Sequence, residues 1–289
     1  MEPGVVLEED RIISSHDMAR ELAQYEPQQE FRTGYYHLDR MTNGFKEGDL
    51  VIISGVTGNG KTEFAVSLAK RYIEQGIHPT FFSYEISSAE LIERFYEEGV
   101  DLPTFYLPRI PKSKTPIWIG QKIGEAQKQF GTKIVFIDHL HYLVDDATSR
   151  NRNTSEMLGQ LCRQFKQIAR HYKVVIFLLC HVRKVDGARP TLDDIKDSSG
   201  IVQEADAVMF MHRKGAKKPR KKANSRVRSK KTEEDDDDDF WEKKPDFSDP
   251  DAVQEVSNEA TLFIEKVRRR GGKLGKIEYV FEDGRYKEL

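Results

Sequence analysis

The residues with the clearest chemical potential lie at positions 55–62, which read GVTGNGKT. Glycine lets backbone N–H groups turn inward around phosphates, a lysine adds positive charge, and a threonine hydroxyl can bind Mg²⁺. The spacing G-x-x-x-x-G-K-[ST] is specific when a strand precedes it and a helix follows. An apolar strand and a helical pattern do flank this loop, which disfavours the alternative of a glycine-rich turn without a ligand. We therefore predict that ATP, or another nucleoside triphosphate, and Mg²⁺ are bound by Gly55, Gly58, Asn59, Gly60, Lys61 and Thr62.

Two acidic residues follow apolar strands and are candidates to act on the same nucleotide. Asp138 ends the strand predicted at 133–138, which suits a Mg²⁺ ligand or a residue that orients the metal's water molecules. Glu85 ends the strand predicted from 80 onward, and it could accept a proton from the attacking water. Parallel sheets bind their ligands at the carboxyl ends of the strands, where both residues are expected. The alternatives are an Asp138 that only caps its strand and a solvated Glu85.

Short apolar strands alternate with helices along most of the chain. Strands are predicted at 50–54, 80–84, 133–138, 174–180, 207–212 and 260–267, followed by a hairpin of 276–281 and 285–286. Helices are predicted at 15–27, 62–75, 88–99 and 156–172. Strands that are apolar throughout and separated by helices indicate a mostly parallel sheet covered on both faces. The predicted fold class is therefore α/β, with one main domain and a C-terminal hairpin.

The net charge of −2 over 289 residues conceals one strongly segregated segment. Residues 214–259 hold 12 basic and 13 acidic residues, with a basic block at 214–231 and an acidic block at 233–239. Such a segment has too few apolar residues to form a core, so we expect a disordered insertion between two strands. The two blocks could pair loosely, the basic block could hold DNA or act as a nuclear-localisation cluster, or the segment could be a solvated loop.

Composition excludes several classes of protein. The sequence has no run of 18 apolar residues that could cross a membrane, and its first ten residues resemble neither a signal peptide nor a transit peptide. Its two cysteines, Cys162 and Cys180, cannot form a disulfide framework. These features predict a soluble intracellular protein with one substantial core and no membrane partner.

Five ordered motifs together resemble the motor domain of hexameric replicative helicases. They are the phosphate loop, the strand ending in Glu85, the strand ending in Asp138-His139, and the segments LLCHVRK (178–184) and DIKDSSGIVQEADAVMFMHR (194–213). The resemblance starts near Gly34, runs to the C-terminus, and covers DnaB-type enzymes, Twinkle and the helicase half of phage primase–helicases. His181 makes the phage branch the closer match. The implied fold is a RecA-like P-loop NTPase core with a mostly parallel central sheet flanked by helices.

The resemblance implies roles for residues outside the phosphate loop. Glu85 would be the catalytic base and Asp138 the aspartate on the metal side. His181, at the tip of the strand at 174–180, would sense the γ-phosphate. The alternatives for His181 are a plain strand-end histidine and a metal ligand paired with Cys180. Adjacent strand residues point to opposite faces, which disfavours a site shared with Cys180.

Lys266 and Arg268 resemble the K-x-R element that these helicases insert into the ATP site of a neighbouring subunit. An arginine supplied in trans stabilises charge on the transferred phosphoryl group. The triplet at 268–270 offers three arginines, of which the spacing to Lys266 favours Arg268; a basic surface tip is the alternative. Two further positions lie near those that hold the nucleotide base in this family: Arg213 and Phe281 (or Tyr279).

Contacts to single-stranded DNA are expected from loops that face the central channel of such rings. Three loops qualify, and their basic residues are Arg150, Arg152, Arg183, Lys184, Arg189 and Lys196. None of these loops is rich in aromatic residues, so we expect contacts to phosphate with little base preference. Solvated surface charges are the alternative.

The leading functional hypothesis is an ATP-driven homo-hexameric helicase that translocates on single-stranded DNA at the replication fork. Residues 1–30 would carry a helix that docks on the adjacent subunit, and residues 31–289 would form the ATPase domain. We expect neither the N-terminal helical domain of DnaB nor a primase domain, so a primase or polymerase partner would be a separate chain. The expected location is the cytoplasm of a bacterial or phage-infected cell, with a nuclear or organellar location as the alternative.

Two other functions compete with the leading one. A RecA-like DNA-dependent ATPase could serve recombination or signalling without unwinding DNA. A binding module that loads or regulates another helicase could use ATP only as a switch. The presence of Glu85 and Asp138 argues against the switch, because a protein without turnover needs no catalytic base.

Overall fold

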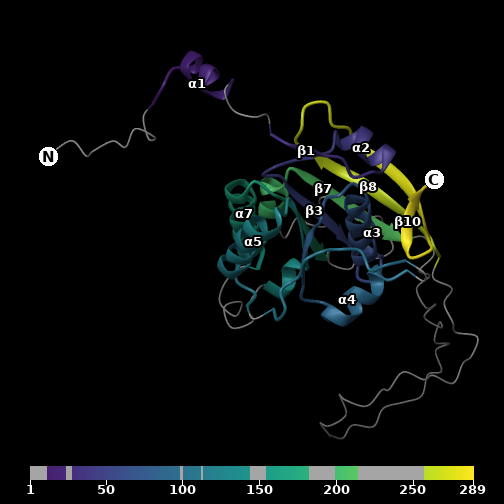
Figure 1. Ribbon diagram of the computed structural model, residues 1–289. Coiled ribbons are helices and arrows are strands. Elements are labelled where there is room, and N and C mark those ends of the chain that lie inside the picture. The colour runs from purple at the N-terminus through teal and green to yellow at the C-terminus, as the bar shows by residue number, and fades with distance from the viewer. Residues whose placement is uncertain are drawn as a thin grey trace, which may run out of the picture.

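The computed structural model describes residues 12–23, 28–97, 100–111, 113–143, 154–181, 199–213 and 257–289. The described residues form an eight-stranded central sheet (Figure 1). In spatial order its strands are β10 (Arg285–Glu288), β9 (Gly275–Glu282), β8 (Glu259–Val267), β7 (Ala207–Arg213), β3 (Leu50–Gly55), β6 (Val175–His181), β5 (Ile134–Asp138) and β4 (Thr80–Ser83). A separate antiparallel pair joins β1 (Glu30–Phe31) to β2 (Phe45–Lys46).

The sheet is parallel on one side and antiparallel on the other. Strands β7, β3, β6, β5 and β4 pair in parallel, whereas β8, β9 and β10 pair antiparallel with their neighbours. All six residues of β3 and all five of β5 are buried, as expected for strands covered on both faces. The predicted α/β class, the mostly parallel sheet and the C-terminal hairpin are confirmed.

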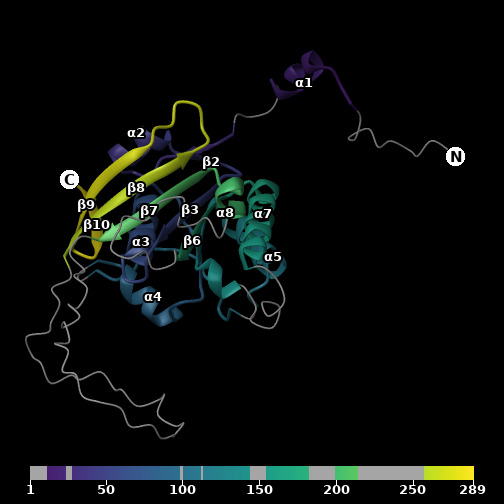
Figure 2. The same cartoon turned by 180° about the vertical axis from the view of Figure 1, so that it is seen from behind.

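Helices cover both faces of the sheet. One face carries α2 (Tyr36–Thr42), α3 (Lys61–Glu74) and α4 (Ser88–Phe95), and the other carries α5 (Pro116–Phe130), α7 (Thr154–Tyr172) and α8 (Ser199–Glu204). Figure 2 shows α5, α7 and α8 grouped together, away from α3 and α4. Strand β6 divides its side chains accordingly: Val175, Phe177 and Leu179 join the first cluster, and Ile176, Leu178 and Cys180 the second. This alternation follows from the two-residue period of a strand.

Several elements were not predicted. The largest is α5, which begins at Pro116 behind the capping hydroxyl of Thr115 and ends at Gly131 in the left-handed conformation. Proline at the start and glycine just past the end are typical helix boundaries. The short elements α2, α8, β1 and β2, and the 3₁₀ turn η2 (Leu140–Leu143), were also missed.

Two predicted elements differ in extent. Helix α1 covers Ser15–Leu22, with Ser14 as its N-cap and Met18 45% exposed, whereas residues 24–27 of the predicted helix lie outside the described part. Helix α4 ends at Phe95, four residues before the predicted end. The predicted insertion at 214–259 lies outside the described residues up to 256, and its last residue, Glu259, begins β8.

Among the helices that the structure describes, none combines the length and the apolar character needed to span a membrane.

Candidate active site

The phosphate loop joins β3 to α3 at the carboxyl edge of the parallel strands. Gly58 and Gly60 have φ of +81° and +79°, in the left-handed region that favours glycine. Gly60 also lies against the Tyr286 hydroxyl of β10, so closely that a side chain there would collide with it. Helix α3 begins at Lys61, in the last two residues of the loop, so its N-terminal N–H groups face the space in front of the loop.

Two side chains hold the loop in shape. The Lys61 ammonium donates to the carbonyl oxygens of Gly55 (2.9 Å) and Val56 (3.1 Å), and burial lowers its pKa. Asn59 donates to Val56 O (3.2 Å) and accepts from the backbone N–H of Arg213 (3.0 Å). The amide of Asn59 therefore ties the loop to the end of β7.

Thr62 and Asp138 form a pair of oxygen ligands beside the loop. The Thr62 hydroxyl donates to Asp138 Oδ2 at 2.7 Å. Asp138 is 1% exposed, and its Oδ1 has no hydrogen-bond partner among the described residues. Burial, reinforced by the nearby Glu85 charge, raises the pKa of Asp138 to about 6. A hydroxyl with a buried, incompletely bonded carboxylate fits Mg²⁺, which prefers hard oxygen ligands.

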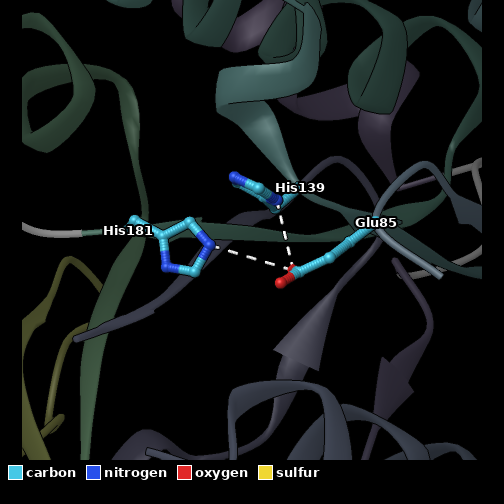
Figure 3. A group of neighbouring side chains, drawn as sticks. All are labelled: Glu85, His139 and His181. Atoms are coloured by element: carbon cyan, nitrogen blue, oxygen red, sulfur yellow. Dashed lines mark ion pairs between the residues drawn. The ribbon is translucent and has the colours of Figure 1, made fainter. Parts of the chain in front are cut away.

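The Glu85 carboxylate faces a pair of neighbouring histidines, His139 and His181 (Figure 3). Its Oε2 is 3.3 Å from His139 Nδ1 and 3.8 Å from His181 Nε2. The other ring nitrogen of His181, Nδ1, is 3.3 Å from the Thr57 hydroxyl of the phosphate loop. Burial and the charge of Lys61 lower the pKa of His181 to about 4, so its imidazole is neutral near pH 7.

Lys61, Thr62, Glu85 and His181 open onto one cavity of about 230 Å³. Its lining includes the phosphate loop and the side chains of Glu85, His181, Arg94 and Arg213. Phe281 is not part of that lining; its ring packs against Tyr286, 5.0 Å between centroids. A larger cavity of about 720 Å³ lies beside α5, away from every residue predicted to act on a nucleotide.

Two residues near the site were missed in the sequence. His139 directly follows Asp138. A polar residue just after a buried strand is a sequence signal that could have marked it as a candidate site residue. Arg94 lies on α4, where it contacts Glu63 and donates to Glu90 at 2.9 Å. No local pattern marks Arg94, because it reaches the cavity only through the packing of α4 beside α3.

Lys266 and Arg268 lie at the opposite edge of the sheet from the phosphate loop. Strand β8 runs antiparallel to β7, so Lys266 pairs with Val208 near the start of that strand. Lys266 donates to Val202 O (2.5 Å), and Arg268 donates to Gln203 O (2.6 Å). Arg268 Nη1 also lies 3.3 Å from Asp206 Oδ1. Neither residue reaches the cavity of its own chain.

Comparison with known proteins identifies the family. The chain matches the family described as DnaB-like helicase C terminal domain over residues 31–109 and 109–287. The chain belongs to this family.

Its relatives include a probable replicative DNA helicase of Trieres chinensis and the replicative DNA helicase DnaB of Treponema pallidum. Each is 30% identical over 213 residues, which cover 63% of this chain and 47% of the relative. The chain therefore spans about half the length of the relatives that it matches.

Solved structures share the fold. One of them, described as an ATPase domain, superimposes with a TM-score of 0.67 at 21% identity, covering 95% of this chain and 96% of that one. A DnaB-like replicative helicase, solved to study its interactions with primase, also gives 0.67 at 21% identity, covering 96% and 67%. At this identity the likeness establishes the RecA-like helicase fold alone.

For this DnaB-like chain, the structure brings together most of the predicted nucleotide residues. The phosphate loop, Glu85, Asp138, His181 and Arg213 lie at one edge of the sheet. All six predicted DNA-binding residues lie outside the described residues: Arg150, Arg152, Arg183, Lys184, Arg189 and Lys196.

Proposed function

We propose that this chain is the motor of a replicative DNA helicase, which hydrolyses ATP and moves along single-stranded DNA. The observation that carries the proposal is the single cavity that Lys61, Glu85 and His181 share at the carboxyl edge of a DnaB-like fold. A phosphate loop, a carboxylate and a neutral imidazole around one cavity suit phosphoryl transfer to water.

The proposal gives each side chain a role that its placement supports. Lys61 and the N–H groups of the loop bind the phosphates, and Glu85 accepts a proton from the attacking water. Thr62 and Asp138 would hold Mg²⁺, which when bound neutralises charge on the phosphates. His181 contacts Thr57 of the phosphate loop and is the last residue of β6, so it links the cavity to the segment that follows β6. Arg213 lies where it could contact the nucleotide, and Phe281 remains a candidate for its base.

The motor acts as a homo-hexamer under this proposal, with each ATP site shared by two subunits. Lys266 and Arg268 lie at the edge opposite the phosphate loop of their own chain, and we assign them to the cavity of another copy. Helix α1 docks on a neighbouring subunit. The basic loops at 150–152, 183–189 and around 196 contact DNA phosphates, and a primase would be a separate partner.

The test is a pair of assays on the purified chain. We expect ATPase activity that single-stranded DNA stimulates and that Lys61→Ala abolishes. Lys128→Ala, an exposed lysine of α5, should leave both rate and stimulation unchanged. The same preparation should displace a strand from a forked duplex. Stimulated hydrolysis without displacement would instead support the DNA-dependent ATPase that does not unwind.

A further inference from the structure

We propose that Glu85, His139 and His181 form a binding site for a divalent transition-metal ion such as Zn²⁺ or Co²⁺. This site differs from the Mg²⁺ pair, Thr62 and Asp138. Each of its three residues offers one ligand atom, and the three atoms all lie within 4.8 Å of one another. Figure 3 shows one nitrogen of each imidazole joined to the Glu85 carboxylate by a dashed line.

The three atoms lie close to the spacing of one shared ion, and small side-chain movements would bring them onto it. Zn²⁺ binds imidazole nitrogen and carboxylate oxygen at about 2.0–2.2 Å in tetrahedral geometry, which places neighbouring ligand atoms about 3.3–3.6 Å apart. Glu85 Oε2 is 3.3 Å from His139 Nδ1 and 3.8 Å from His181 Nε2. The two imidazole centroids are 4.1 Å apart with their planes at 81°, so the rings can direct nitrogens to one point without colliding.

The scaffold holds these ligands firmly. His139 directly follows β5 and is buried, and His181 ends β6; both strands lie inside the parallel sheet. The Thr57 hydroxyl lies 3.3 Å from Nδ1 of His181, where it can accept a hydrogen bond from that nitrogen. That bond would fix the tautomer that leaves Nε2 as the ligand, as outer partners of metal-bound histidines usually do.

The ligand types decide which ion is favoured. Imidazole suits Zn²⁺, Ni²⁺, Cu²⁺ and Co²⁺, whereas Mg²⁺ prefers oxygen. Two histidines with one carboxylate match the ligand set of zinc sites that keep an open coordination position. Glu85 and His181 line the cavity beside the phosphate loop, so that open position would face this cavity.

Occupancy of this site by a metal ion should inhibit ATP hydrolysis, an expectation that rests on the proposed function. A metal bound to Glu85 occupies the lone pair that would accept the proton of the attacking water. Micromolar Zn²⁺ should therefore inhibit hydrolysis by the motor while Mg²⁺·ATP still binds at the phosphate loop.

The direct test is binding of Co²⁺ to the full chain without nucleotide, followed by visible absorption and by competition with Zn²⁺. We expect one Co²⁺ per chain with the intense spectrum of a low-coordinate site. His139→Gln and His181→Gln should each weaken binding at least about tenfold, because each removes a ligand. The matched control is His78→Gln; His78 lies before β4, at the other edge of the sheet, and its Nδ1 contacts Thr104 O.

The metal-binding measurement does not depend on helicase activity. Because His139 is buried and its variant could misfold, Glu85→Gln, at an exposed position, provides the second ligand test and should also lose at least about tenfold in affinity. Absence of binding would overturn the proposal. So would weak, six-coordinate Co²⁺ absorption that all three ligand variants retain, because this would indicate carboxylate sites elsewhere. An inactive ATPase that still binds Co²⁺ through these residues would refute the motor and not the metal site.

Discussion

Asp138 and Glu85 are two carboxylates in one site with different surroundings. Asp138 is enclosed, bonded to Thr62, and has its pKa raised to about 6, whereas Glu85 is exposed at the cavity. Carboxylates whose environments differ in this way usually perform different tasks. The buried one is positioned to bind a cation beside the loop, and the exposed one is free to exchange a proton with water.

At the residue scale, we predict that Glu85→Gln nearly abolishes hydrolysis and leaves nucleotide binding intact. Loss of a general base typically lowers kcat by about 10²–10⁴. Fluorescent nucleotide affinity should change by less than about threefold, since the amide keeps the shape of the side chain. Glu93→Gln, an exposed acid on neighbouring α4, is the control and should retain full activity. A near-normal kcat in Glu85→Gln would assign the base elsewhere.

Helix α8 connects two parts of the molecule despite its six residues. Its Gly200 meets Gly159 of α7 so closely that a Cβ on Gly200 would lie 2.7 Å from Gly159 Cα. The last turn of α8 supplies the carbonyl oxygens that hold Lys266 and Arg268. The contact between Gly200 and Gly159 positions α8, and α8 in turn holds Lys266 and Arg268 through these hydrogen bonds.

At the element scale, we predict that Gly200→Ala destabilises the protein. Overpacking against backbone costs about 1–3 kcal/mol, and only part of this is offset by the helix propensity of alanine. The midpoint of urea unfolding measures the change. Gly120→Ala in α5 is the matched control, because its added methyl would meet the mobile end of Ile168 at 3.2 Å. Equal midpoints for the two variants would contradict the glycine contact.

Glu97, just after α4, joins α3 to the C-terminal hairpin. It accepts from Lys70 (2.8 Å) and from Arg285 (2.8 Å and 3.0 Å), and Lys70 is only 4% exposed. Partial burial raises the pKa of Glu97, but the two hydrogen-bonded cations outweigh it and bring the net pKa below its usual 4.5. The carboxylate form therefore stabilises the fold above pH 4.5, and this contribution is lost as pH falls through the lowered pKa.

We predict that Glu97→Gln lowers the free energy of unfolding by about 1–2 kcal/mol at pH 7, because the Lys70 ammonium keeps its burial without its partner charge. The difference from wild type should shrink as pH falls below 4.5. Unfolding by urea at pH 7 and pH 4 measures both values. Glu74→Gln removes another partner of Arg285 at a more exposed position, and should cost less than about 0.5 kcal/mol. A pH-independent difference would show that charge is not the cause.

Sequence patterns located the strands better than the helices. Runs such as residues 134–137 are short, apolar throughout and rich in β-branched and aromatic residues, which favours a buried strand over a helix. Helix α5 was not predicted, although Thr115-Pro116 and Gly131 mark its ends. The meeting of Glu85, His139 and His181 could not be predicted from spacing, since it depends on the order of β4, β5 and β6 in the sheet.

At the scale of the whole molecule, the two halves of the proposed ATP site lie on opposite edges of the sheet. Strand β8 runs antiparallel to β7. Arg213, at the end of β7, therefore lies at the cavity, whereas Arg268, just after β8, lies at the opposite edge of the sheet. A site that needs both Lys61 and Arg268 therefore needs two copies of the chain.

This arrangement predicts complementation between inactive variants. Arg268→Ala should lower hydrolysis by about 10³–10⁵ and spare nucleotide binding, and Lys61→Ala should be inactive as well. Mixing them in equal amounts should restore activity at about a quarter of the interfaces, where an intact Lys61 meets an intact Arg268. The controls are the hydrolysis rate of each variant measured alone and the sum of these two rates. If the mixture stays inactive while wild type assembles normally, Arg268 does not act on a neighbour.

The opposed edges also give any such assembly a direction. Copies joined edge to edge are related head to tail, so each contact is heterologous and the series either closes or continues without end. An open series always leaves one phosphate loop with no arginine at one end and one arginine with no phosphate loop at the other. A closed ring has neither an unpaired phosphate loop nor an unpaired arginine. Because β8 runs opposite to β7, the closed ring would therefore be the form in which every ATP site is complete.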